Sequence, residues 1–237
     1  MNARSKPLNG VRGVATRPGS IWRMENKPVA LRYAIILIPA VLGAASLFWV
    51  SSSPAGSASF YLATAVAFLV WLSAWLGFGD RRCFSPRAGS TAARELGVGV
   101  GLGVVLLGIF LLGALVTRSI PVLAEPVAGL MDNMRVDALW ATVLTLVLNG
   151  VGEELFFRDV ARRALDSLAS PAASLGLQVA LYVLVTVAMG VPLLLVGSLC
   201  IGLFTALLAR RYGNVLGATA LHLSWSTGMA FLLPLFF

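Results

Sequence analysis

Charged side chains are scarce in this sequence: Asp, Glu, Lys and Arg make up 12% of its 237 residues, about half the share in a typical soluble domain. Residues 33–79, 96–117 and 167–209 contain none at all. A helix needs about 20 consecutive apolar residues to cross a bilayer. The lack of charge therefore excludes an ordinary soluble domain and indicates an integral membrane protein.

Histidine and cysteine are almost absent, with one His and two Cys, Cys83 and Cys200. Two cysteines are too few for a disulfide framework. Zinc needs three or four ligands and the sequence has no His-Glu-x-x-His pattern, so neither a metal nor another cofactor is expected. The basic residues are dispersed without interleaved aromatics, so we expect no nucleic-acid partner.

The apolar runs are continuous and do not alternate, which favours helices over a β-barrel. We expect an all-α, polytopic transmembrane helix bundle in which residues 29–237 form one integral membrane domain. Residues 1–28 are expected to form a flexible, basic cytoplasmic tail. The seven predicted spans are Tyr33–Val50, Ser57–Phe78, Leu96–Thr117, Ala138–Phe157, Ala172–Met189, Leu193–Ala209 and Val215–Leu233.

Four glycines alternate within the third predicted span, at positions 97, 99, 101 and 103. On a helix they form two interlocked small-xxx-small faces, of the kind that let neighbouring helix backbones approach closely. We expect both faces to be packing surfaces. No strand precedes them and no Lys-Ser/Thr follows, so they do not form a phosphate loop.

The positive-inside rule gives the orientation. With the N-terminus in the cytoplasm, 16 of the 18 basic residues lie on the cytoplasmic side, and Arg118 and Arg135 lie on the other. The C-terminus is then extracytoplasmic. Arginine outnumbers lysine 16 to 2, which indicates a GC-rich genome, so we expect the bacterial cell membrane.

Two adjacent glutamates, Glu153 and Glu154, lie at the inner end of the fourth predicted span. An acidic side chain at the centre of a spanning helix costs roughly 2.5–3.5 kcal/mol, so such a pair predicts a functional site. Glu154 and Arg158 are four residues apart and can pair on one helical face, and Asn149 and Glu153 share the adjacent face. The pairing would keep Glu154 ionised and leave Glu153 to take a proton from water.

The only histidine, His222, lies in the last predicted span four residues before Ser226, so both side chains can donate toward one point. Structural interpretations stay open for these residues. The glutamates could mark the wet cytoplasmic end of their helix, paired with nearby arginines. His222 could be a hydrogen-bonded histidine between helices.

A row of polar residues with a spacing of four, Gln178, Tyr182 and Thr186, lies in the fifth predicted span. It could face the glutamates, or it could supply interhelical hydrogen bonds worth about 0.6 kcal/mol each.

The stretch EELFFR at residues 153–158 resembles the first motif, Glu-Glu-x-x-x-Arg, of the CAAX protease and bacteriocin-processing family, which includes the type II CAAX prenyl endopeptidases. The family's second motif is an aromatic residue followed four positions later by His. Tyr182 and Thr186 resemble it, with Thr in place of His. The third motif, His-x-x-x-Asn or a variant, resembles His222 to Ser226. The resemblance covers roughly residues 96–237.

The resemblance implies an intramembrane glutamate-type endopeptidase in which Glu153 activates water, and His222 with Ser226 stabilises the oxyanion. Glu154 and Arg158 would hold the end of the helix. Thr186 cannot act as a base near neutral pH, and the loss of one acid–base group costs about 10²–10⁴ in rate. We therefore keep a second hypothesis, a catalytically impaired relative that acts as a membrane scaffold or immunity-type protein.

A transporter is the third hypothesis, and the absence of paired halves with midplane polar residues disfavours it. The expected partners are the lipid bilayer and a membrane-associated protein or peptide substrate. The sequence gives no indication of the substrate's identity, of its lipidation or of the oligomeric state.

Overall fold

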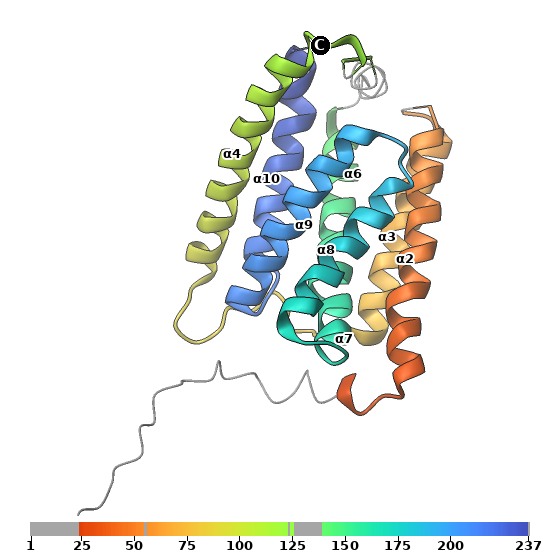
Figure 1. Cartoon of the computed structure of the whole chain (residues 1–237), viewed down its shortest axis with the longest axis vertical. Helices are drawn as coiled ribbons and strands as arrows, with labels where there is room; N and C mark the ends of the chain where they lie inside the picture. The colour runs from red at the N-terminus through yellow and green to blue at the C-terminus, as the bar shows by residue number, and fades with distance from the viewer. Residues whose placement is uncertain (1–23, 55, 123, 126–138, 237) are drawn as a thin grey trace, which may run out of the picture.

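The computed structural model describes residues 24–54, 56–122, 124–125 and 139–236, and the regular elements within these ranges are all helical (Figure 1). Most of the predicted tail and Arg135 lie outside the described residues. The elements are α2 (Val29–Ser52), α3 (Ala58–Phe78), α4 (Ala92–Thr117), α6 (Leu139–Glu153), η1 (Glu154–Ala161), α7 (Arg162–Asp166), α8 (Pro171–Val187), α9 (Pro192–Tyr212), α10 (Leu216–Leu232) and η2 (Leu233–Leu235).

The predicted all-α membrane bundle is confirmed. Five helices of the described chain are long and apolar enough to cross a bilayer: α2, α3, α4, α9 and the continuous helix from Trp140 to Asp166. The helices α8 and α10, with 17 residues each, coincide with the fifth and seventh predicted spans. Each of the seven predicted spans therefore overlaps a helix, although the fourth extends nine residues beyond Phe157 to Asp166.

Local sequence signals fix several helix ends. The hydroxyls of Ser57, Thr91 and Ser170 accept hydrogen bonds from backbone N–H groups in the first turns of α3, α4 and α8, which is the role that Ser and Thr favour at helix N-termini. At its other end α9 stops at Gly213, whose φ of 66° is left-handed, a backbone conformation that glycine adopts without a steric penalty.

The helices enclose the segment η1 at the centre of the bundle (Figure 1). In the outer arrangement α4 packs against α10, α10 against α9, α9 against α8, and α2 against both α8 and α3. The segment η1 contacts α2, α3, α8, α9 and α10. The glutamate motif is therefore placed where helices from both halves of the chain meet.

The prediction for the four glycines was half right. Gly99 and Gly103 face α10, where an added Cβ would meet the carbonyl oxygens of Gly217 and Leu221. Gly97 and Gly101 are exposed, with nothing within 4 Å of an added Cβ. Close helix approach thus uses one small-residue face, because α4 lies at the edge of the bundle and packs mainly against α10 among the described elements (Figure 1).

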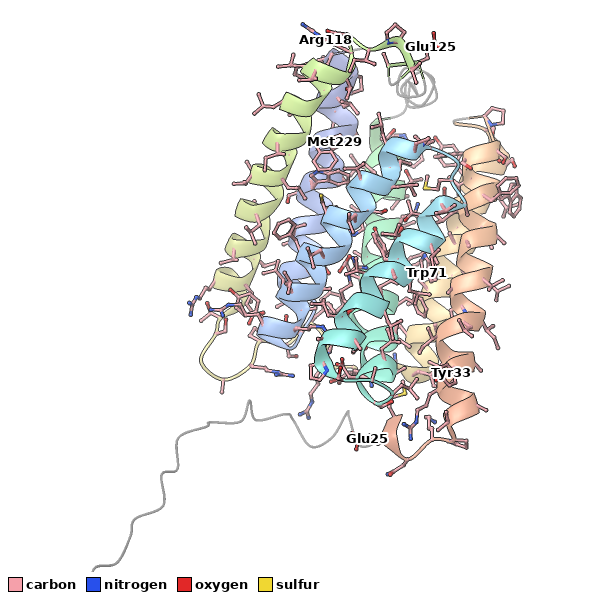
Figure 2. All side chains as sticks on the ribbon, in the orientation of Figure 1. Glu25, Tyr33, Trp71, Arg118, Glu125 and Met229 are labelled. Atoms are coloured by element: carbon pink, nitrogen blue, oxygen red, sulfur yellow. The ribbon has the colours of Figure 1, made fainter. Side chains whose placement is uncertain are left out.

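The two ends of the bundle differ in charge. Glu25 and the start of α2 lie at one end, together with the arginine-rich connections that follow α3, η1 and α9. Arg118 and Glu125 lie at the opposite end, beside the C-terminus (Figures 1 and 2). Apart from Arg118 and the buried Arg158, the described basic residues gather toward the first end, which we call the arginine-rich end.

Candidate active site

The helix that carries the glutamates changes its winding at the motif. After Glu153 the α-helix α6 gives way to π-helix over Glu154–Ala161, and all eight residues of η1 are buried. π-Helical turns are rare and often occur at functional sites. The ring of Phe156 stacks on the fully buried Trp71 with centroids 4.8 Å apart, and Figure 2 shows Trp71 at mid-height in the bundle.

The predicted pair between Glu154 and Arg158 is present and buried. The Arg158 Nε atom lies 3.3 Å from Glu154 Oε2, and the two side chains are 1% and 0% exposed. The same nitrogen donates to Thr205 Oγ1 on α9 at 2.7 Å, and the guanidinium lies 4.3 Å from the centroid of the Tyr182 ring. Arg158 therefore ties η1 to both α8 and α9.

The neighbouring arginines do not neutralise the glutamates. Arg163 pairs with the buried Asp159 at 2.8 Å, and Arg162 pairs with Asp166 at 3.3 Å. Because Glu154 is fully buried and these arginines have other partners, the wet-helix-end interpretation does not fit the structure.

His222 reaches both glutamates from α10. Its Nδ1 atom lies 2.8 Å from Glu154 Oε1, and its Nε2 atom lies 3.9 Å from Glu153 Oε2. An ionised carboxylate only accepts hydrogen bonds, so an ionised Glu154 requires the proton on Nδ1. In a neutral ring Nε2 is then an acceptor, whereas in the imidazolium it is a donor. The structure thus brings together Glu153, Glu154 and His222, the residues that the sequence marked as candidates for the functional site.

Helix α8 supplies one direct partner of the glutamates. The Tyr182 hydroxyl donates to Glu153 Oε2 at 2.6 Å. Thr186 instead donates to the backbone oxygen of Tyr182 at 2.9 Å, and Gln178 donates to the backbone oxygen of Phe157 at 3.0 Å. Both roles predicted for this polar row are therefore present: Tyr182 faces a glutamate, and Gln178 forms a hydrogen bond between helices.

A cavity of about 230 Å³ adjoins these groups. Its polar lining includes Glu153, His222, Ser226, Asn149 and Thr186. Glu153 keeps partial exposure to it, with 14% of the side chain accessible, while Glu154 is closed off. Of the two carboxylates, Glu153 is the one that a substrate or water in the cavity can reach.

The cavity extends away from the arginine-rich end. Its walls continue from His222 to Val50, Leu194, Met229 and Leu233, toward the opposite end, and Figure 2 shows Met229 in that half of the bundle. The buried aromatic rings of η1 fill the space on the other side of the glutamates.

A second cavity, of about 290 Å³, lies between α4, α9 and α10 and is lined almost entirely by apolar side chains. The two cavities share five wall residues: Leu194, Gly197, Trp225, Met229 and Leu233. Across the part of the chain that the structure describes, no group of three or more His, Cys, Asp and Glu side chains is placed to hold a metal ion.

Residues 135–228 match the family described as type II CAAX prenyl endopeptidase Rce1-like. The match confirms the resemblance inferred from the motifs, and it extends from just before α6 into α10. Searches of curated proteins and of solved structures found no match.

The segment that matches contains both glutamates, Arg158, His222 and Ser226, and the description of the matching family names a type II CAAX prenyl endopeptidase. The helices α2, α3 and α4 precede this segment. Of these helices, α3 contributes Trp71, which packs against η1, and α4 packs along α10.

Sequence reasoning missed three partners. Thr205 is one hydroxyl in an apolar run, and nothing in the sequence linked it to Arg158. Asp159 and Asp166 each lie four residues from an arginine, at Arg163 and Arg162, a spacing that marks ion pairs on a helix. That signal was available and would have removed these arginines from the list of partners for the glutamates.

Proposed function

We propose that this protein is an intramembrane endopeptidase of the glutamate type, which hydrolyses a peptide bond in a membrane-associated protein or peptide. One observation carries the proposal. Two carboxylates meet the two ring nitrogens of a single histidine, at 2.8 and 3.9 Å, beside a cavity that only one of the carboxylates reaches.

The arrangement supports a metal-free attack by water. Glu153 takes a proton from a water molecule in the cavity, and the water oxygen attacks the carbonyl carbon of the peptide. The carbonyl oxygen becomes an oxyanion, which His222, as the imidazolium, and Ser226 stabilise. When the C–N bond breaks, Glu153 returns the proton to the departing nitrogen and a carboxylic acid and an amine result.

The surrounding groups position these two residues. Glu154 holds the Nδ1 side of the imidazole, and Arg158 offsets the charge of Glu154 in a site without solvent. The Tyr182 hydroxyl holds Glu153 Oε2 at 2.6 Å. A base that is oriented by such a hydrogen bond loses little freedom when the substrate binds.

The membrane setting follows from the charge asymmetry. With the arginine-rich end in the cytoplasm, the N-terminus is cytoplasmic and the cavity extends into the extracytoplasmic half of the bundle. The substrate would then present its scissile bond in that half of the membrane.

A second candidate function, a scaffold without hydrolytic activity, is supported by Thr186. The Thr186 hydroxyl is bonded to the backbone of its own helix, so it supplies no substitute for the His of the second motif. Tyr182, Ser198 and Ser226 are the other hydroxyls that line the cavity, and none of them is a base near neutral pH.

A cleavage assay distinguishes the two functions. The full-length protein would be reconstituted in liposomes with peptides derived from bacterial membrane proteins, and new termini would be identified by mass spectrometry. The Glu153→Gln variant keeps the size of the side chain and removes the base, so we expect it to abolish cleavage without lowering the unfolding temperature.

The matched control is Glu125→Gln, an exposed glutamate at the far end of the bundle (Figure 2), which should leave cleavage unchanged. Equal cleavage by the wild type and Glu153→Gln would refute the assignment of the base. The absence of cleavage by the wild type would favour the scaffold.

A further inference from the structure

Among the residues that the structure describes, the side chain of Asn149 has no hydrogen-bond partner. It lies on α6 one turn before Glu153 and lines the same cavity as His222 and Ser226. Its Oδ1 atom is buried without a hydrogen bond, and no described residue bonds to its carboxamide. Buried polar groups of native proteins are rarely left unpaired, and those that are need an explanation.

The neighbouring residue fixes Asn149 at the level of His222. An added Cβ at Gly150 would lie 2.7 Å from Leu223 Cδ2 and 3.9 Å from His222 Cδ2. Helices α6 and α10 are therefore in close contact at this height. The carboxamide of Asn149 lines the cavity from α6, while His222 and Ser226 line it from α10.

Most hydrogen-bond donors in the cavity are already used. Tyr182 donates to Glu153, and Thr186 and Ser198 donate to backbone oxygens of their own helices. A neutral His222 that holds Glu154 through Nδ1–H presents only an acceptor at Nε2.

Of the described side chains that line the cavity, three retain an uncommitted donor: Asn149, Ser226 and Trp225. The indole of Trp225 packs edge-on against Phe110, in the wall shared with the apolar cavity. Because the Trp225 Nε1 atom is buried, Asn149 on α6 and Ser226 on α10 are the described uncharged donors best placed for a substrate in the cavity.

We propose that Asn149 is a catalytic residue whose Nδ2 donates to the carbonyl oxygen of the scissile peptide and to the oxyanion formed from it. This inference rests on the proposed endopeptidase function. A carboxamide keeps its donor at every pH, so the contact does not require a protonated His222. The carboxamide of Asn149, to which no described residue bonds, would then make its hydrogen bond to the substrate through Nδ2.

The test uses the full-length protein and a peptide that the cleavage assay above identifies. Asn149→Leu keeps a side chain branched at Cγ and removes both the donor and the acceptor. We expect kcat to fall by about 10²–10³, the usual effect of losing one oxyanion donor, with KM changed by a few fold at most. The unfolding temperature should not fall, because leucine removes an unpaired buried oxygen.

The matched control is Thr145→Val on the same helix. Thr145 donates to the backbone oxygen of Thr142 and does not line the cavity, so kcat should stay within about twofold of the wild type, because no contact with the substrate is lost. A kcat for Asn149→Leu that equals the wild-type value would overturn the inference. So would a fall of the unfolding temperature that accounts for the lost activity.

A second substrate shows which atom of the Asn149 carboxamide contacts the scissile bond. An ester at the scissile position keeps the carbonyl oxygen and lacks the N–H, so Asn149→Leu should slow ester and peptide cleavage by the same factor. If Asn149→Leu slows cleavage of the peptide but not of the ester, Asn149 Oδ1 accepts from the substrate N–H, which contradicts the proposed donation by Nδ2. If the wild type cleaves no peptide, the proposed function fails and the inference fails with it, whereas wild-type cleavage with an unaffected Asn149→Leu overturns the inference alone.

Discussion

Replacing Arg158 by methionine should destabilise the protein more than most single substitutions. Arg158 and Glu154 are 1% and 0% exposed, and breaking a buried ion pair by removing one partner costs 3–5 kcal/mol. After Arg158→Met, Glu154 Oε1 still has His222 Nδ1 at 2.8 Å while Oε2 has no partner. Thr205 keeps its own bond to the backbone oxygen of Ile201. We therefore expect the lower end of the range, a loss of about 3 kcal/mol in the free energy of unfolding.

The assay is reversible unfolding in mixed detergent micelles by titration with a denaturing detergent, followed by tryptophan fluorescence. The control is Arg211→Met, an exposed arginine at the arginine-rich end, for which a change within about 0.5 kcal/mol is expected. The double variant Glu154→Gln with Arg158→Met removes both charges, so it should regain most of the lost stability.

Two results would refute this reasoning. A loss below about 1 kcal/mol for Arg158→Met would place the pair in the range of solvent-exposed ion pairs. A double variant as unstable as Arg158→Met alone would show that an unpaired Glu154 is not the cause.

Further variants test the packing and the site. Gly103→Ala should lower the unfolding temperature, because its Cβ would meet α10. The Cβ of Gly101→Ala would meet nothing within 4 Å, so this variant should stabilise the protein by up to about 1 kcal/mol through helix propensity. Equal effects of the two variants would contradict packing on one face of α4. Burial raises the pKa of the Cys83 thiol to about 12, so the thiol stays protonated at pH 8. In a Cys200→Ser background the folded protein should therefore resist alkylation at that pH. Fast labelling of Cys83 would contradict its burial. Thr186→His should raise the turnover of a peptide substrate if the site lacks only a second base; no change would favour the scaffold.

The bundle was predictable because its signals are long and local. Runs such as residues 96–117 contain no charge, and length alone shows that they can cross a bilayer. The split between the two glycine faces was not predictable, because the sequence of α4 does not record that α10 packs along one side of it.

The contacts of the site between residues four positions apart could be predicted from the sequence, and the contacts between distant residues could not. The interval of four residues predicted the ion pair of Glu154 and Arg158, which the structure contains. The contacts of Glu154 with His222, of Arg158 with Thr205 and of Glu153 with Tyr182 join residues 68, 47 and 29 positions apart. Such contacts depend on how helices rotate against one another, and the π-helical turn after Glu153 changes that rotation. No periodicity in the sequence marks this change of winding.

The contact of one imidazole with two carboxylates is the central claim, and the single histidine makes it measurable without a substrate. Protein labelled with ¹⁵N-histidine and purified without a polyhistidine tag gives ring nitrogen signals from His222 alone. We predict that Glu154→Gln shifts mainly the Nδ1 resonance, since that nitrogen lies 2.8 Å from Glu154, and that Glu153→Gln shifts mainly the Nε2 resonance. Ring signals that stay unchanged in both variants would contradict the account.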